Sequence, residues 1–191
     1  MTTTSFDGPG IVRLGDLDVA CESRGSGDPV VLIHGLAQDH RIWSAVQGRL
    51  SHHRTVAYDL RGHGGTTLGF ADGTLSQLAD DLIALLTVTG PATCVGFSLG
   101  GCVALLAAAQ RPDLVTSVVA MATSSIVGRA AEAGLHERIA AATSDDPDAL
   151  RRILAEDTYQ QLGGDHPDVE SIIATRLDAT SQPNGYVNGA L

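Results

Sequence analysis

The sequence of 191 residues has few cysteines, few aromatic side chains and a deficit of positive charge. Its three cysteines, Cys21, Cys94 and Cys102, lie far apart without the paired spacing of a metal site, which predicts reduced thiols in the core. Twelve Lys and Arg residues against 22 Asp and Glu residues give a formal net charge of −10. Because a surface of that sign repels phosphate backbones, we expect no nucleic-acid partner.

Long apolar runs and targeting signals are also missing. No run approaches the roughly 18–20 residues that cross a bilayer, and the N-terminal MTTTSFDGPG lacks the basic-then-apolar pattern of a secretory signal. We therefore expect a cytoplasmic protein without a membrane partner. Apolar residues make up 43% of the chain, which is ordinary for a folded protein, and the length is enough for a domain with its own core.

What is present is an alternation of strand-like and helix-like segments. A hairpin is expected over residues 11–23, around Gly15-Asp16. Further strands are expected at 29–33, 55–58, 92–97 and 114–121, and helices at 42–50, 75–89 and 99–110. Thr74 and Gln77 have the spacing of a capping box, and Gly90 marks the end of that helix. This order predicts an α/β fold with a mostly parallel sheet and helices on both faces.

From about Ser124 the pattern changes to helices without intervening strands. Ser144 and Pro147 predict one helix start, and His166-Pro167-Asp168 predicts another. We therefore expect a core over residues 1–123 and a helical cap over residues 124–191.

The strongest chemical signal is Gly96-Phe97-Ser98-Leu99-Gly100, which matches G-x-S-x-G between a predicted strand and a predicted helix. A serine on this sharp turn needs small residues two positions before and after it, so that strand and helix can approach each other. Its hydroxyl then points over the carboxyl ends of the strands, where open sheets bind ligands. We predict that Ser98 is a nucleophile; the alternative is a glycine-rich turn with an incidental serine.

A second signal, His34-Gly35-Leu36, follows the strand predicted at 29–33. In a site of this kind, one backbone N–H comes from the loop after that strand and another from the residue after the nucleophile. We therefore predict that the N–H groups of Leu36 and Leu99 form an oxyanion hole. His34 is predicted to order its loop rather than to act as a base.

Three segments, HGLAQDHRIW, YDLRGHGGT and GFSLGG, resemble the α/β-hydrolase superfamily, in its branch of lactonases, cofactor-free haloperoxidase-like esterases and carbon–carbon bond hydrolases. The resemblance implies a serine hydrolase that acts on a small ester, lactone or related carbonyl substrate. It implies neither a metal nor an organic cofactor.

The resemblance also assigns roles within residues 59–66. Asp59, Arg61 and Gly62 are expected to shape a structural loop, with His63 as a structural residue inside it. The family often has a basic residue and then serine where this chain has Gly65-Thr66, which is a mild departure.

Members of the family usually continue past the cap into two further strands, which carry the catalytic acid and histidine. These have no counterpart here, so we expect the histidine and acid to be absent from this chain, and the fold to be truncated after the sixth strand and cap. A serine without a base is a poor nucleophile, so the chain alone is predicted to be a weak catalyst. His166, close to Asp165 and Asp168, is the candidate for a substitute base, ahead of His52, His53 and His136.

The strand predicted at 114–121 is apolar enough for burial on both faces, yet no later strand is present to pair with it. We expect the missing strands to come from a second polypeptide, from a swapped copy in a homo-oligomer or from a longer parent chain. Two other functions stay open. One is a catalytically degenerate fold that serves as a binding or subunit module, and the other is a cofactor-free, non-hydrolytic enzyme such as a cyclase.

Overall fold

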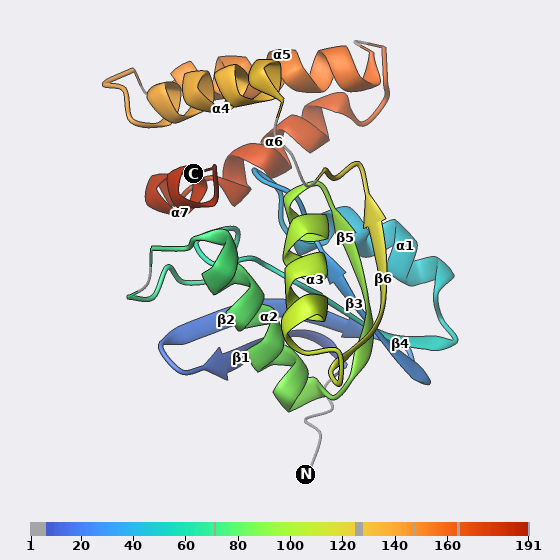
Figure 1. The fold of residues 1–191 in the computed structure, drawn as a ribbon. Coiled ribbons are helices and arrows are strands. Elements are labelled where there is room, and N and C mark those ends of the chain that lie inside the picture. Colours follow the sequence, from blue (N-terminus) through green and yellow to red (C-terminus); the bar gives the residue numbers. More distant parts are fainter. Residues whose placement is uncertain (1–6, 71, 125–127, 147, 164, 191) are drawn as a thin grey trace.

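A mixed sheet of six strands forms the centre of the protein (Figure 1). The computed structural model describes residues 7–70, 72–124, 128–146, 148–163 and 165–190. The strands, in chain order, are β1 (Gly8–Leu14), β2 (Leu17–Arg24), β3 (Asp28–Ile33), β4 (His53–Tyr58), β5 (Ala92–Phe97) and β6 (Val115–Met121). They lie side by side in the order β1-β2-β4-β3-β5-β6. Strands β4, β3, β5 and β6 are parallel, whereas β1 and β2 pair antiparallel, so the predicted mostly parallel sheet is confirmed.

Helices cover both faces of the sheet, as predicted. The short helix η1 (His40–Trp43) and α1 (Ser44–Arg49) lie on one face, and α2 (Leu75–Thr89) and α3 (Leu99–Gln110) lie on the other (Figure 1). The larger apolar core lies between the sheet and α2 and α3, and a smaller one surrounds Trp43. The predicted capping box starts α2: Thr74 Oγ1 accepts from Gln77 N, and Gln77 Oε1 accepts from Thr74 N.

The helices α4 (Arg129–Ala142), α5 (Ala149–Leu162), α6 (Val169–Ala179) and α7 (Pro183–Ala190) form a layer above the carboxyl ends of the parallel strands (Figure 1). We call α4–α7 the helical layer. Its apolar contact with the rest of the chain is a buried cluster of Ala37, Leu154 and Tyr186. None of the helices in the part of the chain that the structure describes is long and apolar enough to cross a membrane.

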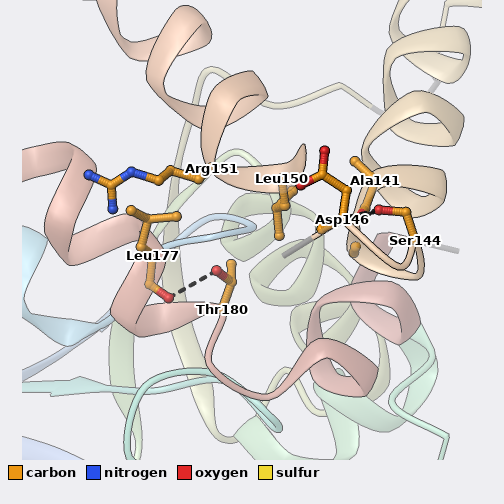
Figure 2. Close-up of a pocket in the computed structure, with 8 residues that line it drawn as sticks. Ala141, Ser144, Asp146, Leu150, Arg151, Leu177 and Thr180 are labelled. Atoms are coloured by element: carbon orange, nitrogen blue, oxygen red, sulfur yellow. Dashed lines mark hydrogen bonds between the residues drawn. The ribbon is translucent and has the colours of Figure 1, made fainter. Parts of the chain in front are cut away.

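A cavity of about 270 Å³ opens between α4, α5 and α6 (Figure 2). Ala142, Leu150 and Leu177 line it and also pack against the cluster around Tyr186, so the cavity lies beside the apolar contact between layer and core. Its polar lining comes from Ser144, Asp146, Arg151 and Thr180. The Thr180 hydroxyl is already used, because it donates to Leu177 O at 3.0 Å.

One predicted helix start is wrong. The Ser144 hydroxyl does not cap the next helix; it donates to Ala141 O at 2.9 Å, at the end of α4. Helix α5 begins instead after Asp148, and no side chain caps it. The other part of that prediction, Pro147, lies outside the described residues.

Strand β6 is an edge of the sheet, as the sequence predicted. It pairs with β5 on one side only, and most of its side chains are exposed, including Val119 at 46% and Met121 at 37%. Unpaired backbone groups and apolar side chains therefore face the surroundings together along this edge.

Candidate active site

Ser98 joins β5 to α3 in a backbone conformation that non-glycine residues rarely adopt, with φ 52° and ψ −117°. Four hydrogen bonds hold it there. Ser98 N donates to Met121 O at 2.9 Å, and Ser98 O accepts from Gly101 N at 2.9 Å, from Cys102 N at 3.4 Å and from Thr123 Oγ1 at 2.8 Å. The sharp turn predicted from the G-x-S-x-G spacing is therefore present, and the surrounding backbone over-determines its strained angles.

The two glycines of the motif are needed for close approach. A Cβ atom on Gly96 would lie 2.2 Å from Gly100 O, and one on Gly100 would lie 2.3 Å from Ile33 O. Both contacts are with backbone atoms, which have no free rotamer to move away. Strand β5, helix α3 and the end of β3 therefore meet at this turn only because neither position carries a side chain.

The structure brings Leu36 and Leu99 together next to Ser98. A Cβ on Gly35 would lie 3.2 Å from Ser98 Cβ, which places the loop after β3 beside the serine. A Cβ on Gly189 of α7 would lie 3.3 Å from Leu36 Cδ1 and 3.7 Å from Leu99 Cδ2. Within the described ranges, neither the Leu36 N–H nor the Leu99 N–H has a hydrogen-bond acceptor. Leu36 and Leu99 thus lie next to α7, and their two backbone donors are free.

His34 is fully buried, and both of its ring nitrogens are used. Nε2 accepts from Leu60 N at 2.9 Å, which fixes the proton on Nδ1, and Nδ1 donates to Gly35 O at 2.7 Å. Burial is the largest effect on the pKa of His34 and lowers it. The ring is therefore a neutral link that ties the loop after β3 to the loop after β4, which is the ordering role expected for it.

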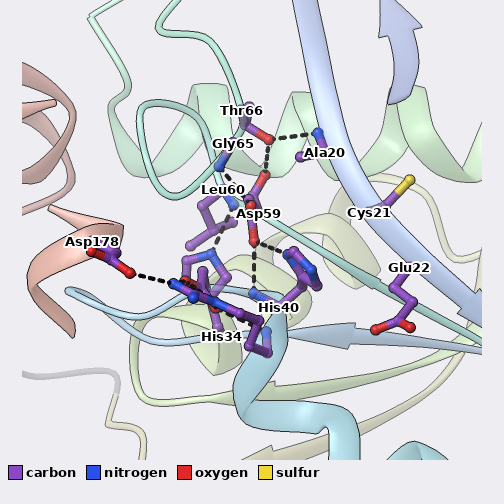
Figure 3. A network of polar contacts seen from close by, with 12 residues as sticks. Ala20, Cys21, Glu22, His34, His40, Asp59, Leu60, Gly65, Thr66 and Asp178 are labelled. Atoms are coloured by element: carbon purple, nitrogen blue, oxygen red, sulfur yellow. Dashed lines mark hydrogen bonds and ion pairs between the residues drawn. The ribbon is translucent and has the colours of Figure 1, made fainter. Parts of the chain in front are cut away.

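Asp59 is the centre of a polar network at the same end of the sheet (Figure 3). It accepts from His40 N at 2.6 Å, from His40 Nδ1 at 2.7 Å and from Gly65 N at 2.8 Å. The Thr66 hydroxyl donates to Asp59 O and accepts from Ala20 N. The hydrogen bond to Asp59 raises the pKa of His40. Burial is the largest effect on the pKa of Asp59 and raises it, but the contact with His40 and the other groups around the carboxylate, including Gly65 N, together bring the pKa below its usual value.

Sequence reasoning missed Asp39 and His40, which with Asp59 place three potential metal ligands within 4.8 Å of one another. Asp39 forms a bidentate ion pair with Arg41, from Nη2 to Oδ2 at 2.6 Å and from Nε to Oδ1 at 3.1 Å, and Asp59 already faces three N–H donors. The donor set thus fits an ion-pair network better than a divalent cation, because each carboxylate is matched by cationic or N–H groups. This ion-pair network joins the loop of residues 34–41 to the loop of residues 59–66.

His63 is also fully buried and lies under α7. Its Nδ1 is 3.1 Å from Arg61 O, whereas Nε2 has no partner among the residues that the structure describes. Burial lowers the pKa of His63 to about 4. Arg61 forms a bidentate ion pair with Asp81, at 2.7 Å and 2.9 Å, as a loop-shaping residue would.

None of the seven histidines, all within the described ranges, forms a hydrogen bond with Ser98. His166 lies in the turn between α5 and α6, where its Nδ1 accepts from Asp168 N at 3.2 Å. His52 and His53 lie at the start of β4, and His136 lies on α4. Among the described residues, the candidate substitute base His166 therefore forms no hydrogen bond with the serine.

Thr123 and Cys102 are a further pair that sequence reasoning did not place. Cys102 Sγ lies 3.1 Å from Thr123 Oγ1, whose hydroxyl in turn holds Ser98 O. Cys102 is half-buried, so the expectation of a core thiol is wrong for it. The expectation fits Cys21 and Cys94, where burial raises each thiol pKa to about 12.

Comparison with known proteins defines the class. Residues 28–171 match the sequence model of the α/β hydrolase fold, and the chain belongs to this family. It is 31% identical over 184 residues to a 2-(acetamidomethylene)succinate hydrolase of Mesorhizobium japonicum, covering 94% of this chain and 63% of that protein. A pimeloyl-[acyl-carrier protein] methyl ester esterase of Nitrosospira multiformis is 30% identical over 116 residues, covering 58% of this chain and 44% of the esterase.

Among solved structures, the enol-lactonase of Burkholderia xenovorans superposes with a TM-score of 0.81 at 21% identity, over 95% of this chain and 72% of the lactonase. A hydrolase of Pseudomonas aeruginosa superposes with a TM-score of 0.80 at 24% identity, over 95% of this chain and 71% of that hydrolase. At these identities the likeness establishes the fold. The chain spans less than two thirds of the curated relatives above and about 70% of the two solved structures.

Proposed function

We propose that the protein is a serine hydrolase that acts on a small ester, lactone or related carbonyl compound. The observation that carries the proposal is the Ser98 turn, with its strained backbone and with two free backbone donors beside it. Ser98 Oγ attacks the substrate carbonyl, and the N–H groups of Leu36 and Leu99 donate to the developing oxyanion. The names of the relatives, which describe hydrolases, an esterase and a lactonase, agree with this chemistry.

We propose further that the proton acceptor for Ser98 is a histidine, oriented by an acid, and that this histidine is not one of the seven in the 191 residues. This proposal is supported by the seven histidines of the chain, none of which forms a hydrogen bond with Ser98 within the described residues. In serine hydrolases the loss of the histidine lowers turnover by a factor on the order of 10⁶. The oxyanion hole and binding alone leave about 10³–10⁴ over water.

Chemical rescue tests both proposals on the chain as it is. Hydrolysis of p-nitrophenyl acetate is measured with increasing imidazole, which is a diffusible base, for the unchanged protein, for Ser98→Ala and for the surface control Ser171→Ala. We expect a small rate for the unchanged protein and for Ser171→Ala that rises with imidazole above the rate of Ser98→Ala. Equal rates for all three proteins at every imidazole concentration would contradict the proposal and favour a binding or subunit module.

We also propose that residues 124–191 act as a cap over a core of residues 1–123. The contacts of α7 with Leu36, Leu99 and His63 support this, since they place α7 over the candidate site.

For the exposed edge, we propose that β6 is covered in the working assembly by further strands of the same parent chain or of a second polypeptide. Support comes from the unpaired side of β6 and the exposure of Val119 and Met121. Sedimentation and hydrogen exchange test this together. Slow exchange along β6 in an oligomer is expected if another copy covers it. A compact monomer with fast exchange there would rule out completion by a second copy.

A further inference from the structure

Each helix of the helical layer contributes one polar side chain to a partly buried cluster, although the four helices come from separate stretches of sequence. The members are Arg138 of α4, Asp157 of α5, Arg176 of α6 and Tyr186 of α7. Tyr186 is fully buried, whereas the side chains of Arg138, Asp157 and Arg176 are 27%, 23% and 13% exposed. Arg138 Nη2 donates to Asp157 Oδ2 at 2.5 Å, and Arg176 Nη2 lies 4.0 Å from the same oxygen. One carboxylate thus faces two guanidinium groups, and the cluster has a positive charge in excess.

The hydrogen-bonding groups left over in this cluster can all donate. Arg138 Nε, Arg176 Nε and the Tyr186 hydroxyl are buried and have no partner among the residues described. A buried donor without an acceptor destabilises the folded state, so three of them together are unusual. The remaining Arg176 contacts, Nη1 to Thr158 Oγ1 at 2.6 Å and to Leu154 O at 3.2 Å, are with neutral acceptors, so Asp157, which already pairs with Arg138, supplies the negative charge that Arg176 faces.

The charges of the cluster act on the tyrosine. Burial, the largest effect, raises the pKa of Tyr186 to about 12, while Arg138 and Arg176 act in the opposite direction. Burial also lowers the pKa of Arg176. With Arg176 13% exposed and Tyr186 1% exposed, this part of the layer has little contact with solvent. In such surroundings a charge-assisted hydrogen bond is stronger than in water.

The same tyrosine links the cluster to the candidate site. The Tyr186 ring packs against Ala37 and Leu154, with Leu36 packed against the same group, and the charges of Arg138 and Arg176 act to lower the pKa of its hydroxyl. Gly189, one turn further along α7, approaches Leu36 and Leu99. Tyr186 therefore belongs both to the apolar cluster that includes Leu36, in the loop beside Ser98, and to the group of unpaired donors.

We infer that Arg138, Arg176 and Tyr186 bind a carboxylate group, so that the substrates of this site are esters or lactones that also carry a free carboxylate. This inference rests on the proposed function for its second half only. The reacting carbonyl lies at Ser98, and the carboxylate lies in the helical layer. A carboxylate has about four lone-pair sites, which matches two N–H donors and one O–H donor and balances the excess positive charge.

The test is direct binding, which is independent of turnover. Succinate, glutarate and adipate are titrated into Ser98→Ala by calorimetry, and the acid that binds best is titrated into variants that also carry Arg176→Gln, Tyr186→Phe, Asp157→Asn or the control Arg152→Gln. Arg152 is a matched control because its ion pair with Asp146 is on the surface of the same layer, with 64% and 49% of the side chains exposed.

We expect Arg176→Gln to weaken binding by about 10-fold or more, since charge-assisted hydrogen bonds contribute about 1.5–3 kcal/mol. Tyr186→Phe keeps the ring and weakens binding by a smaller factor. Asp157→Asn strengthens binding, because it removes the competing carboxylate, and a purely structural role for the cluster does not predict that sign. Arg152→Gln leaves the affinity unchanged.

Three results would overturn the inference. One is the absence of dicarboxylate binding by folded Ser98→Ala. Another is equal affinity in the Tyr186→Phe, Asp157→Asn and Arg152→Gln variants, which also decides the question if Arg176→Gln does not fold. Arg151→Gln is titrated as a further variant, and loss of binding in that variant alone would overturn the inference by placing the anion in the cavity between α4, α5 and α6. None of these results affects the imidazole experiment, so the proposed hydrolase function stands or fails separately.

Discussion

At the scale of single residues, His63 makes stability depend on pH. Burial lowers its pKa in the folded protein from 6.5 to about 4, so between these values the unfolded chain binds a proton that the folded chain does not. The free energy of unfolding therefore falls as pH falls from 7 to 5, by about 2 kcal/mol from this residue. Urea unfolding of the unchanged protein and of His63→Gln at both pH values measures it. An unchanged pH slope in the variant would contradict the prediction.

His40 has the opposite sign. Its pKa in the folded protein is raised by Asp59, so its stabilising contribution is complete below pH 6.5 and is lost as pH rises through the raised value. We expect the free energy of unfolding to decrease above neutral pH and His40→Gln to remove that decrease. With His34 and His63 acting on the acid side, stability should be greatest near pH 6.5. A maximum well above pH 8 would show that the His40–Asp59 contact does not form in solution.

Gly100 tests the packing at the Ser98 turn. A Cβ there meets Ile33 O at 2.3 Å, so Gly100→Ala should lower the free energy of unfolding by about 3 kcal/mol or more. Gly48→Ala in α1 is the matched control, because nothing lies within 4 Å of its Cβ position and alanine favours a helix by about 0.5–1 kcal/mol. Chemical denaturation separates the two. Equal midpoints would mean that the turn is looser than its contacts indicate.

At the scale of elements, the capping box of α2 provides a local prediction. Thr74→Ala removes the hydroxyl that accepts from Gln77 N and should destabilise the protein by about 1 kcal/mol. Thr87→Ala in the same helix removes only an exposed hydroxyl bonded to Ile83 O, and its effect should stay within about 0.5 kcal/mol. Thermal unfolding of both variants measures the difference. A larger loss for Thr87→Ala would show that the cap contributes little.

Elements of this protein are predictable where their signals are local. The apolar run over 29–33, the capping box at Thr74 and the G-x-S-x-G turn each depend on neighbours a few residues away, and the structure has all three. Ser144 failed as a cap because its hydroxyl has a closer acceptor in the preceding helix. Whether the Ser144 hydroxyl bonds to α4 or caps α5 depends on the residue at which α4 ends, and the apolar pattern of α4 does not predict that residue.

At the scale of the whole molecule, α7 is held on the core by a contact between two backbones. A Cβ on Gly185 would lie 2.1 Å from Gly62 O, so Gly185→Ala should lift α7 and speed hydrogen exchange in residues 59–66. Two bonds across this contact, Gly64 N to Ala179 O and Gln182 Nε2 to Thr66 O, should weaken with it. Gly134→Ala in α4, where a Cβ has open space, is the control. Unchanged exchange in 59–66 would contradict the prediction.

Contacts at this scale are the ones that the sequence does not reveal. The motifs identified Ser98, Leu36 and Leu99 because each motif is short, and the structure brings these residues together. The pairs Asp59–His40 and Gly62–Gly185, and the cluster around Asp157, join residues 19 to 123 positions apart without a repeating spacing. Such pairs form only when distant segments of the chain pack against each other in the folded protein, so no local sequence pattern marks them.

The open side of β6 has a practical consequence for any experiment on this protein. An extended peptide can pair with the free edge of β6 as an added strand, at the usual distance of about 4.7–4.9 Å between neighbouring strands. The exposed side chains of Val119 and Met121 can then pack against the side chains of the peptide. Purification tags, cleaved linkers and misfolded neighbours are all such peptides. Tags rich in lysine and proline, which add poorly to a sheet, are therefore the sensible choice for handling it at high concentration.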